Sequence, residues 1–406
     1  MIWLHLAWRN VLANRRRSLL AIGAVAAATV ALILYGNYIN AIRAGLEYST
    51  IHGGTGHLQL SGRGGFDSYS DQPLQFAVTK AQYDALLNAA DRMPDVRRVV
   101  PRLQFSGLVS NGPRTMSFSG QGIDPVAEKT AFGSRQTMVA GKPLDGRSPD
   151  DSVVLGKELA RRLGIKPGDT VTVLSPTVSG ALNAMDLTVT GIETTGTPQS
   201  DLFYLRAPLT AVQSLMATDR VSTVAILLDE QADLGAAERQ LLAAVPGIEA
   251  RDWLQLTPIY QQVVQLYEDQ FRVFGSFIVL VTLFGLATLI LTSVLERTRE
   301  IGTLRALGIG KLSVRQIFLL EGILIAVIGL ILGTALGAAS SSIANALHVT
   351  MPPPPGRTTG YPLRLLWDWR AVGIAWLAIV ALGSITAWLT SGRIARLKVV
   401  DALATI

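Results

Sequence analysis

Four stretches of the chain carry mostly apolar side chains and no Asp, Glu, Lys or Arg. They cover residues 18–42, 273–295, 322–347 and 371–392. A helix needs roughly 20 apolar residues to cross a bilayer whose hydrocarbon core is about 30 Å thick. Ser, Thr and Asn side chains within such helices can bond to their own or a neighbouring helix. The pattern therefore predicts four transmembrane helices, TM1 to TM4.

The first stretch has an alternative interpretation, a cleaved signal peptide that follows the basic residues 15–17. The apolar part of a signal peptide is about 7–15 residues long. The run at 18–42 is longer than that. We therefore favour a retained transmembrane helix.

The long segment 43–272 alternates between short apolar runs and turn residues, which is typical of an α+β domain. Helices are expected at Lys80–Ala90, Lys157–Leu163 and 232–245, and the ends 43–55 and 255–272 are expected to form helical stalks. Strands are expected at 57–60, 99–103, 107–109, 115–119, 153–155, 170–174, 187–192, 221–228 and 248–252. The predicted fold is a membrane protein with four transmembrane α-helices and a large α+β extracytoplasmic domain between the first and the second.

Composition supports this fold class. Hydrophobic residues make up 49% of the chain and charged residues 16%, whereas soluble domains carry about 25% charged residues. The chain has no cysteine, which excludes disulfides, thiolate metal sites and cysteine catalysis. The net charge of +6 matches nucleic-acid binding only if the basic residues form a patch, so their position matters.

The basic residues concentrate at one membrane face. Segments 1–17, 296–321 and 393–406 hold 12 basic and 4 acidic residues, whereas 43–272 holds 21 basic and 25 acidic residues. Lys and Arg mark cytoplasmic loops, so both termini are predicted in the cytoplasm. We expect an interfacial helix at 1–17, a cytoplasmic tail at 393–406 and a short external Pro-rich loop at 348–370. The charge thus indicates topology, and no nucleic-acid partner is expected.

Catalytic patterns are missing from the sequence. The four histidines are His5, His52, His57 and His348, and neither His-Glu-x-x-His nor Gly-x-Ser-x-Gly occurs. The glycine-rich residues 53–56 between His52 and His57 are interpreted as a flexible loop. An intramembrane protease or a proton carrier would require charged residues within the membrane, and the predicted spans contain none. We therefore expect a non-catalytic subunit without a metal or cofactor site.

The segment 296–322 is the most specific feature of the sequence. It predicts a charged helix end, a glycine joint, a short apolar and basic helix, a second glycine joint and a helix that re-enters the membrane. An ordinary cytoplasmic hairpin is the alternative. The segment resembles the coupling region of FtsX-like/MacB-like ABC transporter permeases, with the form E-R-x-x-E-I-G-x-x-[RK]-A-x-G. The matching residues are Glu296, Arg297, Glu300, Ile301, Gly302, Arg305, Ala306, Gly308, Glu321 and Gly322.

The resemblance extends beyond this segment. Residues 7–10 and 15–17 are similar to the family's opening, and 393–403 to its closing. Within the family, the four spans and the string at 56–60 are most similar to LolC/LolE-type lipoprotein-releasing permease subunits. The proline run 352–355 departs from these subunits and is interpreted as a stiff extended loop.

The resemblance implies a permease of the bacterial inner membrane that acts by mechanotransmission. It also implies a second permease copy or a relative, and two copies of a cytoplasmic ABC ATPase. ATP and Mg²⁺ would bind that ATPase, because the chain lacks a Walker A motif. Residues 303–309, including Leu304 and Leu307, would dock in a groove of the ATPase, where Arg305 would pair with an acid.

Three functions follow from the resemblance. The first is extraction of lipoproteins or lipid-like cargo from the inner membrane, with TM1 and TM2 lining a lateral opening. The second is MacB-like efflux with a periplasmic adaptor and an outer-membrane channel. The third is FtsX-like regulation of a cell-wall hydrolase.

Three glycines recur at every fourth position of the third span. Gly329, Gly333 and Gly337 form a small-xxx-small stripe, which lets helix backbones approach closely. The partner of the stripe is TM1 or TM4 of the same chain, or a second copy at a dimer seam. We favour packing within the chain.

Overall fold

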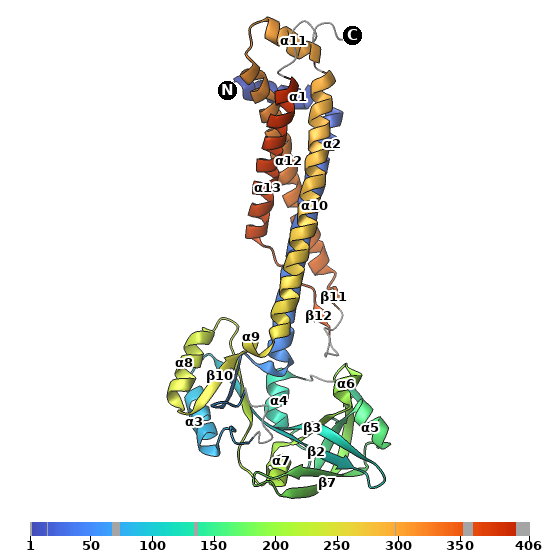
Figure 1. The fold of residues 1–406 in the computed structure, drawn as a ribbon, viewed down its shortest axis with the longest axis vertical. Helices are drawn as coiled ribbons and strands as arrows, with labels where there is room; N and C mark the ends of the chain where they lie inside the picture. The colour runs from blue at the N-terminus through green and yellow to red at the C-terminus, as the bar shows by residue number, and fades with distance from the viewer. Residues whose placement is uncertain are drawn as a thin grey trace. The chain divides into compact units, whose positions relative to one another are not determined.

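The structure is a computed structural model that describes residues 2–13, 15–66, 74–133, 137–296, 298–351 and 360–394. The chain divides into two compact units (Figure 1). The helical unit comprises Met1–Ala44, Val263–Val349 and Leu363–Ile406, and the sheet unit comprises Gly45–Gln262 and Thr350–Pro362. The helices α2 and α10 carry residues of both units.

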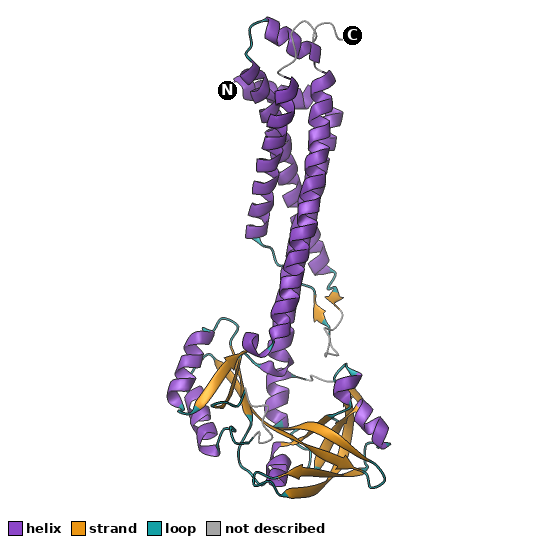
Figure 2. Ribbon diagram, viewed as in Figure 1, coloured by secondary structure: helices purple, strands orange, loops and turns teal. Residues whose placement is uncertain are grey.

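The helical unit consists of four long helices and two shorter ones among the described residues (Figure 2). They are α1 (Ile2–Ala13), α2 (Arg15–Thr50), α10 (Pro258–Glu296), α11 (Thr298–Ala306), α12 (Lys311–Ala346) and α13 (Trp369–Ile394). The predicted interfacial helix over residues 1–17 was wrong in its C-terminal boundary. The helix α1 ends at Ala13, and Arg15, Arg16 and Arg17 form the first turn of α2. Their long stems can extend along the apolar helix while their charges stay at its polar end.

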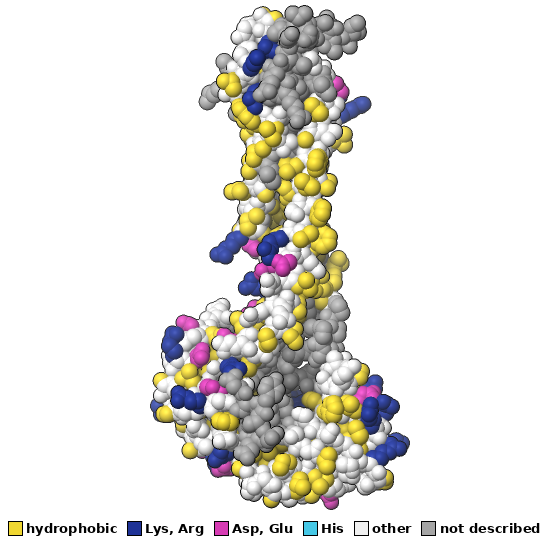
Figure 3. Space-filling view, in the orientation of Figure 1, with side chains coloured by type: hydrophobic (Ala, Val, Ile, Leu, Met, Phe, Trp, Pro, Cys, Tyr) yellow, Lys and Arg dark blue, Asp and Glu magenta, His cyan; other side chains and the backbone are white. Residues whose placement is uncertain are grey.

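The predicted spans lie on α2, α10, α12 and α13. Within the described chain, three segments are long and apolar enough to cross a membrane, namely Arg15–Thr55, Lys311–Ala346 and Trp369–Leu389. The span on α10 therefore stays a prediction, as does the total of four. Figure 3 shows hydrophobic side chains over the visible face of these helices. Their core includes Val11 of α1, Val25 of α2, Leu330 of α12 and Ile379 of α13.

The sheet unit contains one mixed ten-stranded sheet. The strand order is β10-β1-β9-β2-β3-β8-β5-β7-β4, and β6 pairs with β2 and β7. The pairs β3–β8 and β5–β7 are parallel, and the other pairs are antiparallel. The strands are β1 (Leu58–Gly62), β2 (Val96–Ser110), β3 (Thr115–Ile123), β4 (Thr137–Gly141), β5 (Ser152–Gly156), β6 (Thr170–Pro176), β7 (Leu182–Thr194), β8 (Tyr204–Pro208), β9 (Thr223–Leu228) and β10 (Ile248–Asp252).

Short helices cover the sheet. They are the π-turn η1 (Ile51–Thr55), α3 (Lys80–Ala90), α4 (Pro125–Phe132), α5 (Lys157–Leu163), α6 (Pro198–Asp201), α7 (Leu209–Met216), α8 (Leu234–Ala244) and α9 (Trp253–Leu256). A two-stranded ribbon, β11 (Thr350–Met351) with β12 (Tyr361–Pro362), also belongs to this unit. The proline run 352–355 and the tail 395–406 lie outside the described residues.

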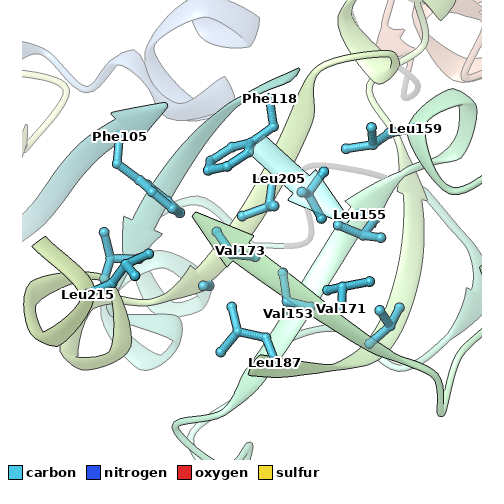
Figure 4. Close-up of a cluster of buried hydrophobic side chains, with 14 of the residues drawn as sticks. Phe105, Phe118, Val153, Leu155, Leu159, Val171, Val173, Leu187, Leu205 and Leu215 are labelled. Atoms are coloured by element: carbon cyan, nitrogen blue, oxygen red, sulfur yellow. The ribbon is translucent and has the colours of Figure 1, made fainter. Parts of the chain in front are cut away.

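The sheet has two apolar cores. One gathers side chains of β2, β3 and β5–β8 with α5 and α7, and its Phe105 and Phe118 rings lie 5.0 Å apart at their centres (Figure 4). The other joins β1, β9 and β10 to α3 and α8, with Leu58, Leu60 and Leu241 fully buried. The long strand β2 contributes to both cores, so it connects the two halves of the sheet.

The predicted helices Lys80–Ala90 and Lys157–Leu163 are confirmed as α3 and α5. Thr79 and Gln82 form a capping box before α3, and Gly164 ends α5 in the left-handed conformation with φ 74°. The separation of strands 99–103 and 107–109 was wrong, because both belong to β2. A Cβ on Gly107 would lie 1.9 Å from the carbonyl oxygen of Leu174 in β6. Gly107 thus permits the close approach of the β6 backbone and does not mark a strand boundary.

Candidate functional site

The predicted coupling segment contains one short helix, α11, whose C-terminal end is exposed. The first predicted glycine joint was wrong, because Gly302 lies inside α11, and the chain breaks at Gly308–Gly310, before α12. The helix α11 ends where Leu307 N donates to Thr303 O at 3.0 Å and Gly308 adopts φ 91°, a left-handed conformation that favours glycine. Gly310 then serves as the N-cap residue of α12. Leu307 follows α11 and is 81% exposed. An exposed leucine at a helix end presents an apolar surface suited to a groove.

The residues matched in the coupling segment lie in different environments. Glu296 ends α10 and forms an ion pair with Arg17 in the first turn of α2. Gly302 is buried, Arg305 is half-buried and has a partner, and Ala306 and Gly308 are exposed. Arg297 lies outside the described residues, and so do the side chains of Glu300, Ile301 and Leu304.

The glycine stripe of α12 lies against α2 of the same chain. A Cβ on Gly329 would lie 2.6 Å from the Cβ of Val25, and a Cβ on Gly333 would lie 2.5 Å from the Cβ of Thr29. Gly337 faces Ile33 in the same way, at 3.3 Å. Such distances leave no room for a larger residue at the first two positions, so the glycines set the spacing of the two helices.

A polar contact extends this interface by one further turn. Asn37 of α2 donates from Nδ2 to Oγ of Ser341 in α12 at 3.2 Å, and both residues are buried. Sequence reasoning treated Asn and Ser within the spans as generic polar residues. Asn37 follows Ile33 by four residues, and Ser341 follows Gly337 by four residues. This equal spacing was the signal from which their contact could have been predicted.

A second contact joins the N-terminal part of α12 to the C-terminal part of α13. The guanidinium of Arg315 lies over the indole of Trp388, 3.7 Å from the ring centroid, and donates to the Trp388 carbonyl oxygen at 3.1 Å. The contact therefore ties the N-terminal part of α12 to α13. Sequence analysis used Arg315 only as one of the positive charges, because the two residues are far apart in the sequence.

In the sheet unit, a buried ion pair fixes the chain that follows α2. Arg102 donates from Nε to Glu128 at 2.6 Å and from Nη1 to the Gly54 carbonyl oxygen at 2.5 Å. Arg102 and Glu128 are 5% and 3% exposed. The ring of Phe132 lies 5.1 Å from the Arg102 guanidinium carbon. These contacts hold η1, β2 and α4 together. We call the group of Gly54, Arg102, Glu128 and Phe132 the stalk anchor.

Apolar contacts complete the stalk anchor. Ile51, Val100, Phe132 and Trp253 form one buried cluster, and Tyr260 at the start of α10 packs edge-on against Trp253. Both chain segments that enter the sheet unit, after α2 and before α10, thus end on the same cluster. Sequence analysis predicted helical stalks but identified none of these residues.

His57 has a structural role. Its Nδ1 accepts a hydrogen bond from the Leu228 backbone nitrogen at 3.0 Å, and its backbone nitrogen donates to Ile226. Burial, helped by the neighbouring His52, lowers the pKa of His57 below its usual value. A neutral ring is required for this bond, because a protonated imidazole has no acceptor.

Comparison with known proteins gives two family matches. Residues 18–244 match the MacB-like periplasmic core domain, and residues 272–399 match the FtsX-like permease C-terminal. The first match covers more than half of the chain, including α2 and most of the sheet unit. The second contains the predicted coupling segment and the last three predicted spans.

Individual relatives are distant. The chain is 24% identical over 267 residues to the lipoprotein-releasing system transmembrane protein LolC of Neisseria meningitidis, covering 64% of each chain. It is 22% identical over 312 residues to LolE of Haemophilus influenzae, covering 72% of this chain and 74% of LolE. It is 27% identical over 423 residues to the macrolide export ATP-binding/permease protein MacB of Shigella sonnei, covering 99% of this chain and 60% of MacB. The matches therefore span less than two thirds of LolC and MacB.

Proposed function

Because the chain belongs to the ABC transporter permeases that combine a MacB-like periplasmic core domain with an FtsX-like C-terminal part, we propose that it is a mechanotransmitting permease subunit. A separate cytoplasmic ATPase binds ATP and Mg²⁺, and this chain passes the resulting movement to its extracytoplasmic domain. Two permease chains, identical or related, assemble with two ATPase subunits in a bacterial inner membrane. Both termini lie in the cytoplasm.

The observation that carries this proposal is the exposed tip of the coupling segment. Leu307 projects at the end of α11, and α11 lies between α10 and α12 in the chain. The ATPase groove receives residues 303–309, and Arg305 pairs with an acid there. Glu296 and Arg17 join the cytoplasmic ends of α10 and α2, so a push on α11 reaches both stalk helices.

The stalk anchor supports the other end of the same path. An ion pair buried in a protein is held rigidly by its hydrogen bonds and by the cost of separating its charges. Arg102 uses its three nitrogens on Glu128 and on Gly54. Movement of the stalk residues is therefore passed to β2, the strand that both cores share.

The cargo we propose is a lipoprotein or a similar lipid-anchored molecule of the outer leaflet. The similarity to LolC and LolE supports this choice, as do the four predicted spans. Efflux of the MacB kind is the second candidate, favoured by a match that covers 99% of this chain. The two functions differ in their companions, lipoproteins in one and an adaptor with an outer-membrane channel in the other.

The docking step is tested with Leu307→Asp. A carboxylate on the exposed tip should weaken retention of the ATPase by about tenfold or more, since a central apolar contact contributes about 2 kcal/mol. Leu182→Asp is the matched control, because Leu182 is 77% exposed but belongs to the sheet unit. Co-purification of the ATPase with tagged full-length protein is the measurement. Equal retention by both variants would contradict docking through this tip.

The cargo is tested in the same preparation. Mass spectrometry of the wild-type complex, trapped with a non-hydrolysable nucleotide, should identify acylated lipoproteins and the ATPase. Detection of an adaptor and an outer-membrane channel, without lipoproteins, would contradict lipoprotein extraction and favour efflux of the MacB kind. Absence of any ATPase would overturn the permease mechanism itself.

A further inference from the structure

The helical unit contains a cavity of about 780 Å³ between α2, α10 and α13. Its size falls within the roughly 300–1,000 Å³ typical of small-molecule sites. Small residues line it on all three helices, including Gly36, Gly275 and Ala378. A Cβ on Gly36 or Gly275 would make only ordinary contacts, at 3.5 Å to Ala371 and 3.6 Å to Leu32. Unlike the glycines of α12, these two are not required for helix approach, so they leave space open.

The cavity has an apolar part and a charged end. Leu32, Val279 and Leu283 belong to the apolar lining, whereas Glu268 and Arg370 lie near the outer ends of the predicted spans. Along α10, the lining from Glu268 to Leu283 rises about 22 Å at 1.5 Å per residue. That length is about half of a bilayer of ~40–45 Å including its headgroup regions. The cavity therefore has the depth of one leaflet.

Two of the charges near this end are already engaged. Arg272 forms an ion pair with Asp269. Asp368 accepts hydrogen bonds from the Arg370 backbone nitrogen at 2.8 Å and from Nδ2 of Asn40 at 3.1 Å. Burial acts to raise the pKa of Asp368, but these bonds and the Arg370 charge outweigh it and lower that pKa. Asp368 is thus an ionised cap that ties α13 to α2.

Two opposite charges remain available to a ligand. The carboxylate of Glu268 and the guanidinium of Arg370 are exposed, and neither side chain forms a hydrogen bond or an ion pair among the described residues. The Arg370 charge also acts on Asp368, but its guanidinium nitrogens stay open to a ligand. They stand on different helices and line the same cavity. An anion and a cation at the mouth of an apolar cavity complement a headgroup that carries both charges.

We propose that this cavity holds one zwitterionic phospholipid of the bilayer, of the phosphatidylethanolamine type. Its acyl chains fill the apolar part, Arg370 binds the phosphate and Glu268 binds the ammonium group. An anionic phospholipid has no cation to offer Glu268. The fully acylated anchor of a lipoprotein has no charged headgroup, so it would leave Glu268 and Arg370 without a binding partner. The lipid is a resident component, so the inference does not depend on the proposed cargo.

Native mass spectrometry of the full-length protein, purified with any bound ATPase in a mild detergent, measures the occupant. The wild type should retain one phosphatidylethanolamine per chain. Ala378→Phe fills the cavity and should reduce the retained lipid by about tenfold, as expected when apolar contacts of ~1.4 kcal/mol are lost. Ala381→Phe is the matched control, since Ala381 is an exposed residue of the same helix outside the cavity lining. Equal retention by both variants would overturn the site.

The headgroup is tested by exchange in nanodiscs that contain equal amounts of phosphatidylethanolamine and phosphatidylglycerol. The wild type should select phosphatidylethanolamine, and Glu268→Lys should reverse the selection because the ammonium partner becomes a cation. Glu268 is exposed, so this variant keeps the proposal testable if Ala378→Phe does not fold. Selection of phosphatidylglycerol by the wild type, or no change in Glu268→Lys, would overturn the headgroup assignment.

The source of the lipid is tested with a photoactivatable phosphatidylethanolamine. It should crosslink to α10 or α13 in the wild type and should not be displaced by an excess of a triacylated lipopeptide, whose acylated N-terminus carries no charge. Displacement would identify the cavity as a cargo site and overturn the proposal of a resident lipid.

Discussion

The two units of this chain bury apolar side chains in opposite ways. In the sheet unit, Leu58, Leu60 and Leu205 are completely buried. In the helical unit, Phe277, Phe284 and Leu377 are 58%, 66% and 73% exposed. Apolar residues leave water wherever a core is available to them. The difference indicates that the helical surface contacts lipid instead of water.

The buried polar contacts of the two units also differ, although the helical unit buries one carboxylate, that of Glu321 in α12. The sheet unit buries two Arg–Glu pairs, Arg102 with Glu128 and Arg206 with Glu193. Burial acts to lower the pKa of Arg206, but Tyr204, Glu193 and Glu128 outweigh it and raise that pKa, so the guanidinium stays charged. The buried contact between α2 and α12 is neutral, Asn37 with Ser341. A neutral pair costs less to place in hydrocarbon than an ion pair.

The largest effect is expected from breaking the stalk anchor. Arg102→Leu leaves the Glu128 carboxylate buried without its guanidinium and should lower the free energy of unfolding by about 3–5 kcal/mol. Arg98→Leu, at an exposed position of the same strand, should change it by less than ~0.5 kcal/mol. Chemical unfolding followed by tryptophan fluorescence is the measurement. Equal stability of the two variants would remove the distinction between the units.

Overpacking the glycine stripe should have the next largest effect. Gly333→Leu must displace Thr29 and the Ala26 carbonyl oxygen, at a cost of roughly 1–3 kcal/mol. Gly373→Leu is the control, because nothing lies within 4 Å of a Cβ built there. Thermal unfolding and yield of monodisperse protein in detergent compare them. A normal Gly333→Leu protein would show that close approach of α2 and α12 is not required.

The Arg315–Trp388 contact should contribute less. A double-mutant cycle with Arg315→Gln and Trp388→Leu should give a coupling energy of about 1 kcal/mol, the usual size of an exposed cation–π pair. Thermal unfolding of the four proteins yields this energy. A value near zero would show that α12 and α13 are joined only by their apolar core.

The smallest effect concerns pH and belongs to the sheet unit alone. The pKa of His57 is lower in the folded protein than its usual value of 6.5, so the unfolded chain binds the proton more strongly. The contribution of His57 to stability should be fully present at pH values above 6.5 and should decrease as the pH falls below 6.5. His57→Gln removes this titration, and its melting temperature should depend less on pH between about 7 and 5. Parallel pH profiles of the two proteins would contradict the assigned role.

Local and membrane features could be predicted from the sequence. The capping box at Thr79, the helix Lys157–Leu163 and the glycine end at Gly164 depend on neighbouring residues only. The predicted spans depend on length and charge-free composition, which the chain carries by itself. By contrast, Gly107 was predicted to begin a separate strand, whereas it lies inside β2. The reason for a glycine there is a carbonyl of β6 that lies 67 residues further along the chain.

The sequence by itself determined which segments are apolar and free of charge, where the basic residues concentrate along the chain and which residues match the family's coupling region. Each of these rests on composition or on spacing along the chain. Only the tertiary structure decided that Gly333 faces Thr29, that Arg102 joins Glu128 to Gly54 and that Glu268 and Arg370 share one cavity. These pairs lie far apart in the chain, and a short-range contact or an open volume exists only after helices and strands have packed.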